Sequence, residues 1–222
     1  MRLLLISNST NSGESYLQHA GDDIKQFLGD KVKKVLFIPY AAVSFSFDEY
    51  QKKVQQKFDE LGVKVDSLHN YLPARKKEAI KKAEAIVVGG GNTFHLLKYL
   101  QQEQLIEIIR YMVLDGTPYI GWSAGANVAC PTICTTNDMP ITEPDSFHAL
   151  NLVRFQINPH YLDAHPDGHA GETREMRIKE FLVVNPYIYT LGLREGSKLL
   201  IEEGEAKLLG DKNARIFKNG QE

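Results

Sequence analysis

Residues 118–127 constrain the fold more than any other stretch of this sequence. An apolar run, Tyr119–Trp122, leads directly into Ser123, and Gly121 and Gly125 complete a Gly-x-Ser-x-Gly pattern. The pattern predicts a strand that turns sharply into a helix, with glycines that avoid steric collisions at the turn. Ser123 Oγ would then stand at the carboxyl edge of a sheet, beside the free N–H groups of a helix start. The alternative is a glycine-rich turn in which the serine is only structural.

Up to this serine, the chain alternates between short apolar runs and longer amphipathic segments. The apolar runs predict strands at Leu3–Ile6, Lys34–Pro39, Val63–Leu68, Ala85–Val88 and Tyr119–Trp122. The amphipathic segments predict helices at Glu14–Leu28, Phe47–Leu61, Lys76–Glu84, Thr93–Gln102 and Leu105–Leu114. This alternation predicts an α/β fold with a mostly parallel sheet, helices on both faces and ligands at the carboxyl ends of the strands.

Beyond Cys134 the alternation weakens, and residues 135–151 have the composition of a loop. The next predicted elements are a brief strand, a helix and a strand, at Phe155–Ile157, Glu172–Val184 and Tyr187–Leu193. Short runs separated by glycines then predict a C-terminal β meander at Lys198–Ile201, Ala206–Leu209 and Ala214–Phe217. The sequence has no internal repeat or linker, so we expect residues 1–222 to form a single domain.

Composition argues against two classes of partner. The net charge of −2 gives no electrostatic signature of nucleic-acid binding. No apolar run approaches the roughly 20 residues that a membrane helix needs. The short apolar run after Met1 is better explained as a first buried strand than as a signal peptide. We therefore expect a cytoplasmic protein with no nucleic-acid or membrane partner.

The sequence also offers little for a disulfide or a metal. Two cysteines, Cys130 and Cys134, do not make a disulfide framework, and burial is the expected role of Cys130. Three histidines fall within residues 160–169, but Pro166 and Gly168 break the segment and no His-Glu-x-x-His helix is present. We expect neither a metal nor a cofactor.

A second glycine-rich stretch, Gly89-Gly90-Gly91-Asn92, follows a predicted strand. It lacks the Gly-Lys-Ser/Thr of a phosphate-binding loop. An oxyanion hole fits better, because the N–H groups of Gly90 and Gly91 can approach a developing negative oxygen closely, and Ala124 supplies another. A tight turn in which Asn92 or Thr93 caps the next helix is the alternative, and the two roles are compatible.

A reactive serine needs a base and an acid that orients the base. Among the seven histidines, His160 is favoured because it follows Asn158-Pro159 after an apolar strand, which would reach the same crevice if it ended in the same sheet. The acid stays open on these grounds. Candidates by residue type are Asp138, Glu143, Asp145, Asp163 and Glu195. An α/β-hydrolase order would favour Asp138 or Asp145, but chain order alone does not decide.

Five motifs together resemble the peptidase E family, bacterial α-aspartyl dipeptidases that share a serine peptidase family with cyanophycinase. The motifs are Gly-Gly-Gly-Asn-Thr-Phe at 89–94, Ile-Gly-Trp-Ser-Ala-Gly-Ala-Asn at 120–127, Thr-Thr-Asn-Asp-Met-Pro at 135–140, Ile-Asn-Pro-His at 157–160 and Gly-Glu-Thr-Arg-Glu at 171–175. The match extends from Leu3–Ile6 to about Gly196. The resemblance implies a fold like that of class I glutamine amidotransferases, with serine in place of their cysteine.

The resemblance also implies roles for the candidate residues. Ser123 is carried over as the nucleophile, His160 as the general base and Glu195 as the orienting acid. Asp138 is the alternative acid, or else a ligand of the substrate's free amino group. The implied chain order is therefore serine, histidine, glutamate.

Arg174 matches the residue that the family uses to select aspartate. The planar fork of arginine can pair with a carboxylate through two hydrogen bonds. We expect Arg174, Asp138 and Asn92 to form the substrate-binding set. The alternative is an arginine on the helix surface, paired with Glu175 or Glu180.

The sequence thus predicts a serine dipeptidase that cleaves small peptides after an N-terminal aspartate, as a monomer or weak homodimer. A cyanophycinase-like enzyme that acts on β-linked aspartyl groups is the main alternative. A carboxylesterase would accept esters and ignore aspartyl peptides. A non-catalytic binding module should lack one of the three catalytic residues, and all three are present.

Overall fold

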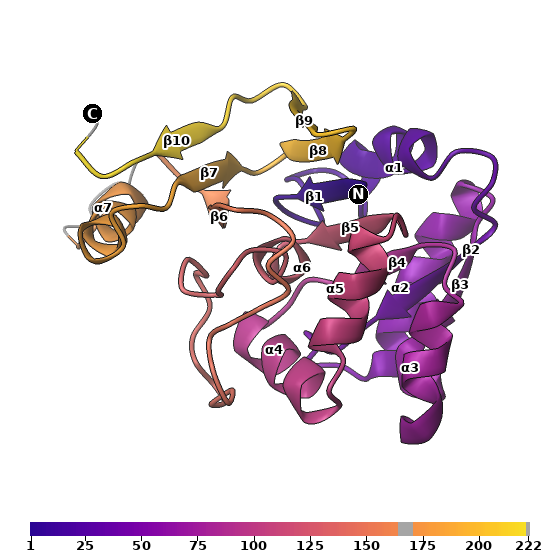
Figure 1. The fold of residues 1–222 in the computed structure, drawn as a ribbon. Helices are drawn as coiled ribbons and strands as arrows, with labels where there is room; N and C mark the ends of the chain where they lie inside the picture. The colour runs from indigo at the N-terminus through magenta and orange to yellow at the C-terminus, as the bar shows by residue number, and fades with distance from the viewer. Residues whose placement is uncertain (164–170, 221–222) are drawn as a thin grey trace.

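The protein is described by a computed structural model over residues 1–163 and 171–220, and its main sheet has seven strands in the order β3-β2-β4-β5-β1-β8-β9 (Figure 1). The strands are β1 (Leu3–Ile6), β2 (Lys34–Ile38), β3 (Lys64–Ser67), β4 (Ile86–Val88), β5 (Tyr119–Trp122), β8 (Lys198–Glu202) and β9 (Glu205–Leu209). The five strands from β3 to β1 are parallel, while β8 pairs antiparallel with β1 and forms a hairpin with β9. The predicted α/β fold with a mostly parallel sheet is confirmed.

Helices cover both faces of this sheet because successive strand side chains point to opposite faces. In β1, Leu4 and Ile6 join the core beneath α1 (Gly21–Leu28) and α2 (Phe47–Glu60). Leu3 and Leu5 join the core on the other face. The helices there are α3 (Pro73–Lys81), α4 (Thr93–Gln102) and α5 (Ile106–Leu114). Among residues 1–163 and 171–220, no helix combines the length and the hydrophobicity needed to cross a membrane.

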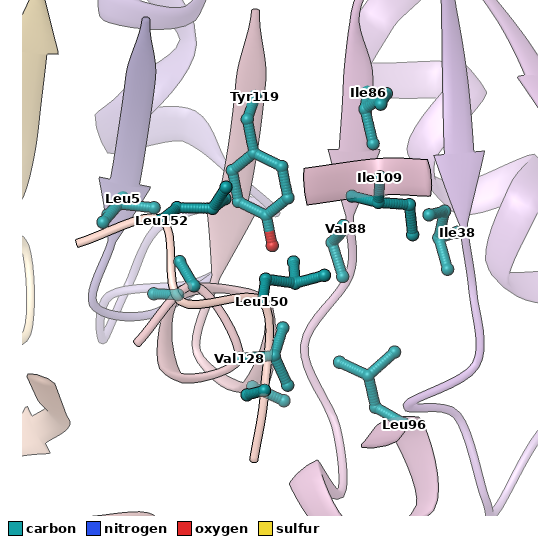
Figure 2. Close-up of a cluster of buried hydrophobic side chains, with 14 of the residues drawn as sticks. Leu5, Ile38, Ile86, Val88, Leu96, Ile109, Tyr119, Val128, Leu150 and Leu152 are labelled. Atoms are coloured by element: carbon teal, nitrogen blue, oxygen red, sulfur yellow. The ribbon is translucent and has the colours of Figure 1, made fainter. Parts of the chain in front are cut away.

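The predicted loop between the sharp turn at Ser123, which we call the elbow, and β6 (Gln156–Tyr161) ends in a segment that packs into the core. Figure 2 shows Leu150 and Leu152 inside the apolar cluster with Tyr119 of β5 and Val128. Backbone hydrogen bonds reinforce this packing, since the Leu150 amide donates to the Val128 carbonyl at 2.9 Å. The chain that leads to β6 is therefore fixed against the helix that follows Ser123.

A second sheet contains β6 (Gln156–Tyr161), β7 (Thr190–Arg194) and β10 (Arg215–Phe217), in the order β10-β7-β6. It packs against α7 (Arg174–Val184), and Figure 1 shows both beside the main sheet. The predicted strand Phe155–Ile157 thus continues to Tyr161 and does not end in the main sheet. The predicted meander is correct only for β8 and β9, because β10 pairs with β7.

Two predicted helices begin three or more residues away from the expected start, while α5 and α7 begin one and two residues later than predicted. In place of a helix from Glu14, a 3-10 turn covers Gln18–Ala20 and α1 starts at Gly21, because Leu17 adopts a left-handed conformation with a φ of 53°. The helix predicted from Lys76 starts at Pro73, whose fixed φ and missing N–H suit the first turn of a helix. Neither difference affects the strand ends where the candidate site lies.

Candidate active site

Ser123 lies at the sharp turn between β5 and the short helix α6 (Ala124–Asn127), as the sequence predicts. Its φ of 52° and ψ of −112° are a strained conformation for a residue with a side chain. A Cβ on Gly121 would lie 2.3 Å from the Gly125 carbonyl oxygen, and one on Gly125 would lie 2.2 Å from the Val88 carbonyl oxygen. Only glycine fits at either position, which explains the spacing of the motif.

His160 approaches Ser123 from the second sheet through an irregularity in β6. Between Asn158 and Tyr161 the pairing with β7 shifts register, so β6 has one more residue than β7 over this stretch. His160 itself has a left-handed φ of 54°. Bulges of this kind redirect side chains, and here the imidazole reaches the serine.

Ser123, His160 and Glu195 form one hydrogen-bonded chain. His160 Nε2 is 3.0 Å from Ser123 Oγ, and His160 Nδ1 is 2.7 Å from Glu195 Oε1. An ionised carboxylate only accepts hydrogen bonds, so Glu195 favours a proton on Nδ1 and leaves Nε2 as the acceptor for the serine hydroxyl. This arrangement can remove the serine proton while Oγ attacks an electrophilic carbon.

Two buried polar residues after β1 hold the strands that carry the histidine and the glutamate. Ser7 Oγ accepts a hydrogen bond from the His160 amide at 2.9 Å and donates to the Leu193 carbonyl at 2.7 Å. Asn8 Oδ1 accepts from the Gly196 amide at 2.7 Å and fixes the turn after β7. Neither residue was predicted from the sequence. The available signal was a polar run directly after a buried strand, at the edge where parallel sheets bind ligands.

Ser7→Ala is expected to lower both stability and kcat. It leaves the His160 amide and the Leu193 carbonyl without their partner, which costs about 1–3 kcal/mol and lowers the melting temperature by about 3–10 °C. Displacement of His160 should reduce kcat by up to about 100-fold. Ser67→Ala is the matched control, because Ser67 is also buried and ends β3, four strands from β1 in the sheet. It should lower the melting temperature alone, and an unchanged kcat in Ser7→Ala would show that Ser7 does not position the histidine.

The glycine loop after β4 lies against the serine. A Cβ on Gly90 would be only 3.0 Å from Ser123 Cβ. Within the described residues, the amides of Gly90, Gly91 and Ala124 donate no hydrogen bond to another protein group. Backbone N–H groups in this position are free to stabilise a negatively charged oxygen beside the serine.

Asp138 and Asn92 tie the loop at 135–140 to the start of α4. Asp138 Oδ2 accepts hydrogen bonds from the Thr93 amide at 2.7 Å and the Thr93 hydroxyl at 2.6 Å. The Asn92 side chain caps α4 and donates to the Met139 carbonyl at 2.9 Å. Because Glu195 occupies His160 Nδ1, Asp138 is not the acid partner of the histidine here. Direct contact of Asp138 or Asn92 with a substrate stays a prediction.

Arg174 begins α7 and lines a cavity of about 150 Å³ together with Asp138 and Arg177. Its guanidinium donates to Asn137 Oδ1, and Asn137 Nδ2 donates at 2.6 Å to the carbonyl of Pro159, directly before the histidine. The cavity therefore adjoins the strand that carries the catalytic candidate. Asn137 was not predicted as a site residue, although it lies within the motif at 135–140.

The cavity is suited to an anionic group. Burial and the neighbouring charge of Arg177 lower the pKa of Arg174, while the carboxylate of Asp138 opposes this shift. Arginine nevertheless remains protonated in proteins. Neither alternative ion pair of Arg174 is present in the described residues: Glu175 is bound to Arg215 at 2.6 Å and to Lys179 at 2.8 Å, and Glu180 forms no salt bridge there. Arg174 therefore presents its charge toward the cavity.

The cysteines and histidines outside the triad form no further centre in the described residues. Cys130 is buried, as predicted, and its Sγ accepts a hydrogen bond from the Ile157 amide at 3.2 Å. Burial raises the pKa of Cys130 to about 12, which keeps the thiol protonated. No three His, Cys, Asp or Glu side chains of residues 1–163 and 171–220 are grouped to bind a metal ion. His165 and His169 lie outside the described residues.

Comparison with known proteins places this site in a family. Residues 3–209 match the model of peptidase family S51. This chain belongs to peptidase family S51. Membership of this family identifies the chain as a serine-type peptidase, in agreement with the peptidase E names of its relatives.

Two relatives named peptidase E match over the full length of the chain. Peptidase E of Nostoc sp. (strain PCC 7120 / SAG 25.82 / UTEX 2576) is 56% identical over 221 residues, which cover 100% of this chain and 90% of the relative. Peptidase E of Salmonella typhimurium is 48% identical over 222 residues, which cover 100% of this chain and 96% of the relative.

Solved structures share the fold of this S51 chain. A peptidase from an acI-B1 Actinobacterium has a TM-score of 0.67 and 19% identity, over 99% of this chain and 95% of the other. A Listeria monocytogenes EGD-e protein provisionally assigned as peptidase E has a TM-score of 0.70 and 23% identity, over 95% and 98% of the two chains. At these identities the likeness concerns the fold alone.

Proposed function

We propose that this S51 peptidase is an α-aspartyl dipeptidase, which hydrolyses the peptide bond after the N-terminal aspartate of small peptides. The observation that carries the proposal is the position of Arg174. Its protonated guanidinium lines a small cavity and is linked through Asn137 to the residue before His160. An aspartate side chain is a short anion of the kind that such a cavity can hold.

In the proposed mechanism, Ser123 Oγ attacks the carbonyl carbon of the aspartyl residue while His160 Nε2 takes the hydroxyl proton. Glu195 keeps the imidazole oriented and stabilises the imidazolium. The free amides of Gly90, Gly91 and Ala124 bind the tetrahedral oxyanion, and one such donor is typically worth about 3–4 kcal/mol.

The same groups complete the reaction. His160 returns its proton to the leaving amine as the carbon–nitrogen bond breaks, and water then hydrolyses the acyl-enzyme with His160 again as base. Asp138 lines the same cavity as Arg174 and is the proposed acceptor for the ammonium group of the substrate. No metal or cofactor takes part. The cytoplasmic location and the monomeric or weakly dimeric state stay predictions.

The substrate class is tested by the hydrolysis of Asp-Leu, Asn-Leu, Glu-Leu and β-Asp-Leu under one set of conditions. We expect kcat/KM for Asp-Leu to exceed the other values by about 100-fold or more, because the neutral analogue leaves Arg174 unpaired and the longer or β-linked analogues misplace the scissile bond. Preferential cleavage of β-Asp-Leu would favour the cyanophycinase-like alternative. Equal rates for Asp-Leu and Asn-Leu would contradict recognition of the side-chain charge.

A further inference from the structure

The hydroxyl of Tyr50, a buried residue of α2, lies between two parts of the candidate active site. It donates to the Gly90 carbonyl at 3.0 Å and accepts a hydrogen bond from Trp122 Nε1 at 3.1 Å. The Tyr16 hydroxyl donates to it at 3.4 Å. Trp122 directly precedes Ser123, so one phenol joins the elbow strand to the glycine loop.

The hydrogen bond from Tyr50 fixes the middle of the glycine loop, whose two ends are held by backbone hydrogen bonds. One end is fixed because the Gly89 amide donates to the Ile38 carbonyl at 3.2 Å. The other end is fixed because the Asn92 amide donates to the Ala41 carbonyl at 2.8 Å. Between them, within the described residues, the hydroxyl of Tyr50 is the only protein group hydrogen-bonded to the Gly90–Gly91 peptide.

The carbonyl of Gly90 and the N–H of Gly91 belong to one planar trans peptide, so they point in opposite directions. Two flanking glycines give this plane little steric resistance to rotation. A hydrogen bond that holds the carbonyl on the side of Tyr50 therefore also sets the direction of the N–H. The loop is built to allow this contact, because a Cβ on Gly89 would lie 2.7 Å from the Tyr50 hydroxyl oxygen.

We propose that Tyr50 is a positioning residue, which orients the Gly91 N–H for binding the oxyanion. The inference rests on the proposed mechanism, in which that N–H is a donor to the tetrahedral intermediate. Burial raises the pKa of Tyr50, so its hydroxyl stays protonated as a donor through the neutral range. Tyr50 contacts no reacting group and acts through the Gly90–Gly91 peptide that it holds, while its bond from Trp122 Nε1 keeps the phenol in place.

Tyr50→Phe removes the hydroxyl and keeps the ring. Because the oxyanion forms only in the transition state, we expect kcat and kcat/KM for Asp-Leu to fall together by about 10–100-fold, with KM unchanged. A second readout uses a fluorophosphonate, which labels a reactive serine without needing an aspartate side chain. The rate of Ser123 labelling should fall by a similar factor, whereas a loss confined to KM would overturn the proposal.

Tyr16→Phe is the matched control, because Tyr16 belongs to the same aromatic cluster but its hydroxyl interacts with Tyr50 and Trp122 and not with the glycine loop. It should keep kcat and the labelling rate within about threefold of wild type. A change of this size is what the loss of one weak, neutral hydrogen bond outside the site can cause. An equal loss in Tyr16→Phe would mean that general loosening of the cluster is responsible, and would overturn the proposal.

Replacement of Tyr50 by 4-aminophenylalanine tests rescue, because its amine is again a donor at the same place. We expect this variant to recover most of the lost rate, and it serves in place of Tyr50→Phe if the latter does not fold. A folded amino variant as slow as Tyr50→Phe, or slowed tenfold from wild type, would overturn the role of Tyr50.

If wild type were labelled no faster than Ser123→Ala, the proposed nucleophile would fail first and this role with it. Normal labelling of wild type with an unchanged rate in Tyr50→Phe would overturn the positioning role alone.

Discussion

Ser123→Ala is expected to reduce kcat for Asp-Leu by about 10⁴–10⁶-fold while the protein stays folded. The loss is large because no other group replaces the attacking oxygen. The fold should survive because the Ser123 side chain does not cap α6. The first turn is held instead by the backbone carbonyl of Ser123, which accepts from the Ala126 amide at 3.0 Å. Initial-rate assays and thermal melts followed by circular dichroism measure the two effects.

The control for this substitution is Ser67→Ala, which makes the same chemical change at the end of β3 and should leave kcat near the wild-type value. A kcat of Ser123→Ala within about tenfold of wild type would rule out Ser123 as the nucleophile, since removal of a triad serine lowers kcat by far more than tenfold. Loss of the folded baseline in the melt would instead indicate that the hydroxyl supports the elbow.

Arg174→Ala is expected to lower kcat/KM for Asp-Leu by about 10²–10³-fold. Removal of the guanidinium leaves the substrate carboxylate desolvated and unpaired, which costs about 2–5 kcal/mol. The slow hydrolysis of Asn-Leu should change by less than about tenfold, because its neutral amide carries no such penalty. The ratio of the two kcat/KM values is the decisive measurement.

Two companion variants separate charge from geometry in this pocket. Arg174→Lys keeps the charge but loses the planar fork, so an intermediate loss for Asp-Leu is expected. Arg177→Ala removes a positive charge from the same cavity, but the Arg177 side chain is 64% exposed, so solvent screening should make the loss smaller. Equal losses for Asp-Leu and Asn-Leu in Arg174→Ala would mean that Arg174 only supports the structure around Asn137.

Local sequence patterns predicted the elements around the nucleophile well. The strands β1 and β5 have the predicted bounds, because buried parallel strands are short apolar runs that polar residues or turns interrupt. The elbow was predictable for a similar reason. A side chain on Gly121 would collide with the nearby Gly125 carbonyl, and one on Gly125 would collide with the Val88 carbonyl of the neighbouring strand. The helix starts were less accurate where a left-handed Leu17 or a proline at the first turn decided the boundary.

The partners of the nucleophile depended on contacts that the sequence does not encode locally. Reasoning from residue type left five acids open, and the resemblance to a family favoured Glu195. In the structure, Glu195 meets His160 because β6 and β7 pair side by side and a bulge turns the histidine toward the serine. A bulge arises from the pairing of two strands, so a single strand's pattern does not reveal it.

The sequence by itself determined the α/β architecture, the elbow that presents Ser123 and the glycine loop beside it, because periodicity and steric necessity act over a few neighbouring residues. The tertiary structure alone decided that β6 and β7 leave the main sheet, that Ser7 and Asn8 brace them, and that the hydroxyl of Tyr50 holds the glycine loop. These contacts join residues far apart in the chain, so they depend on how the strands and helices pack and not on any local sequence pattern.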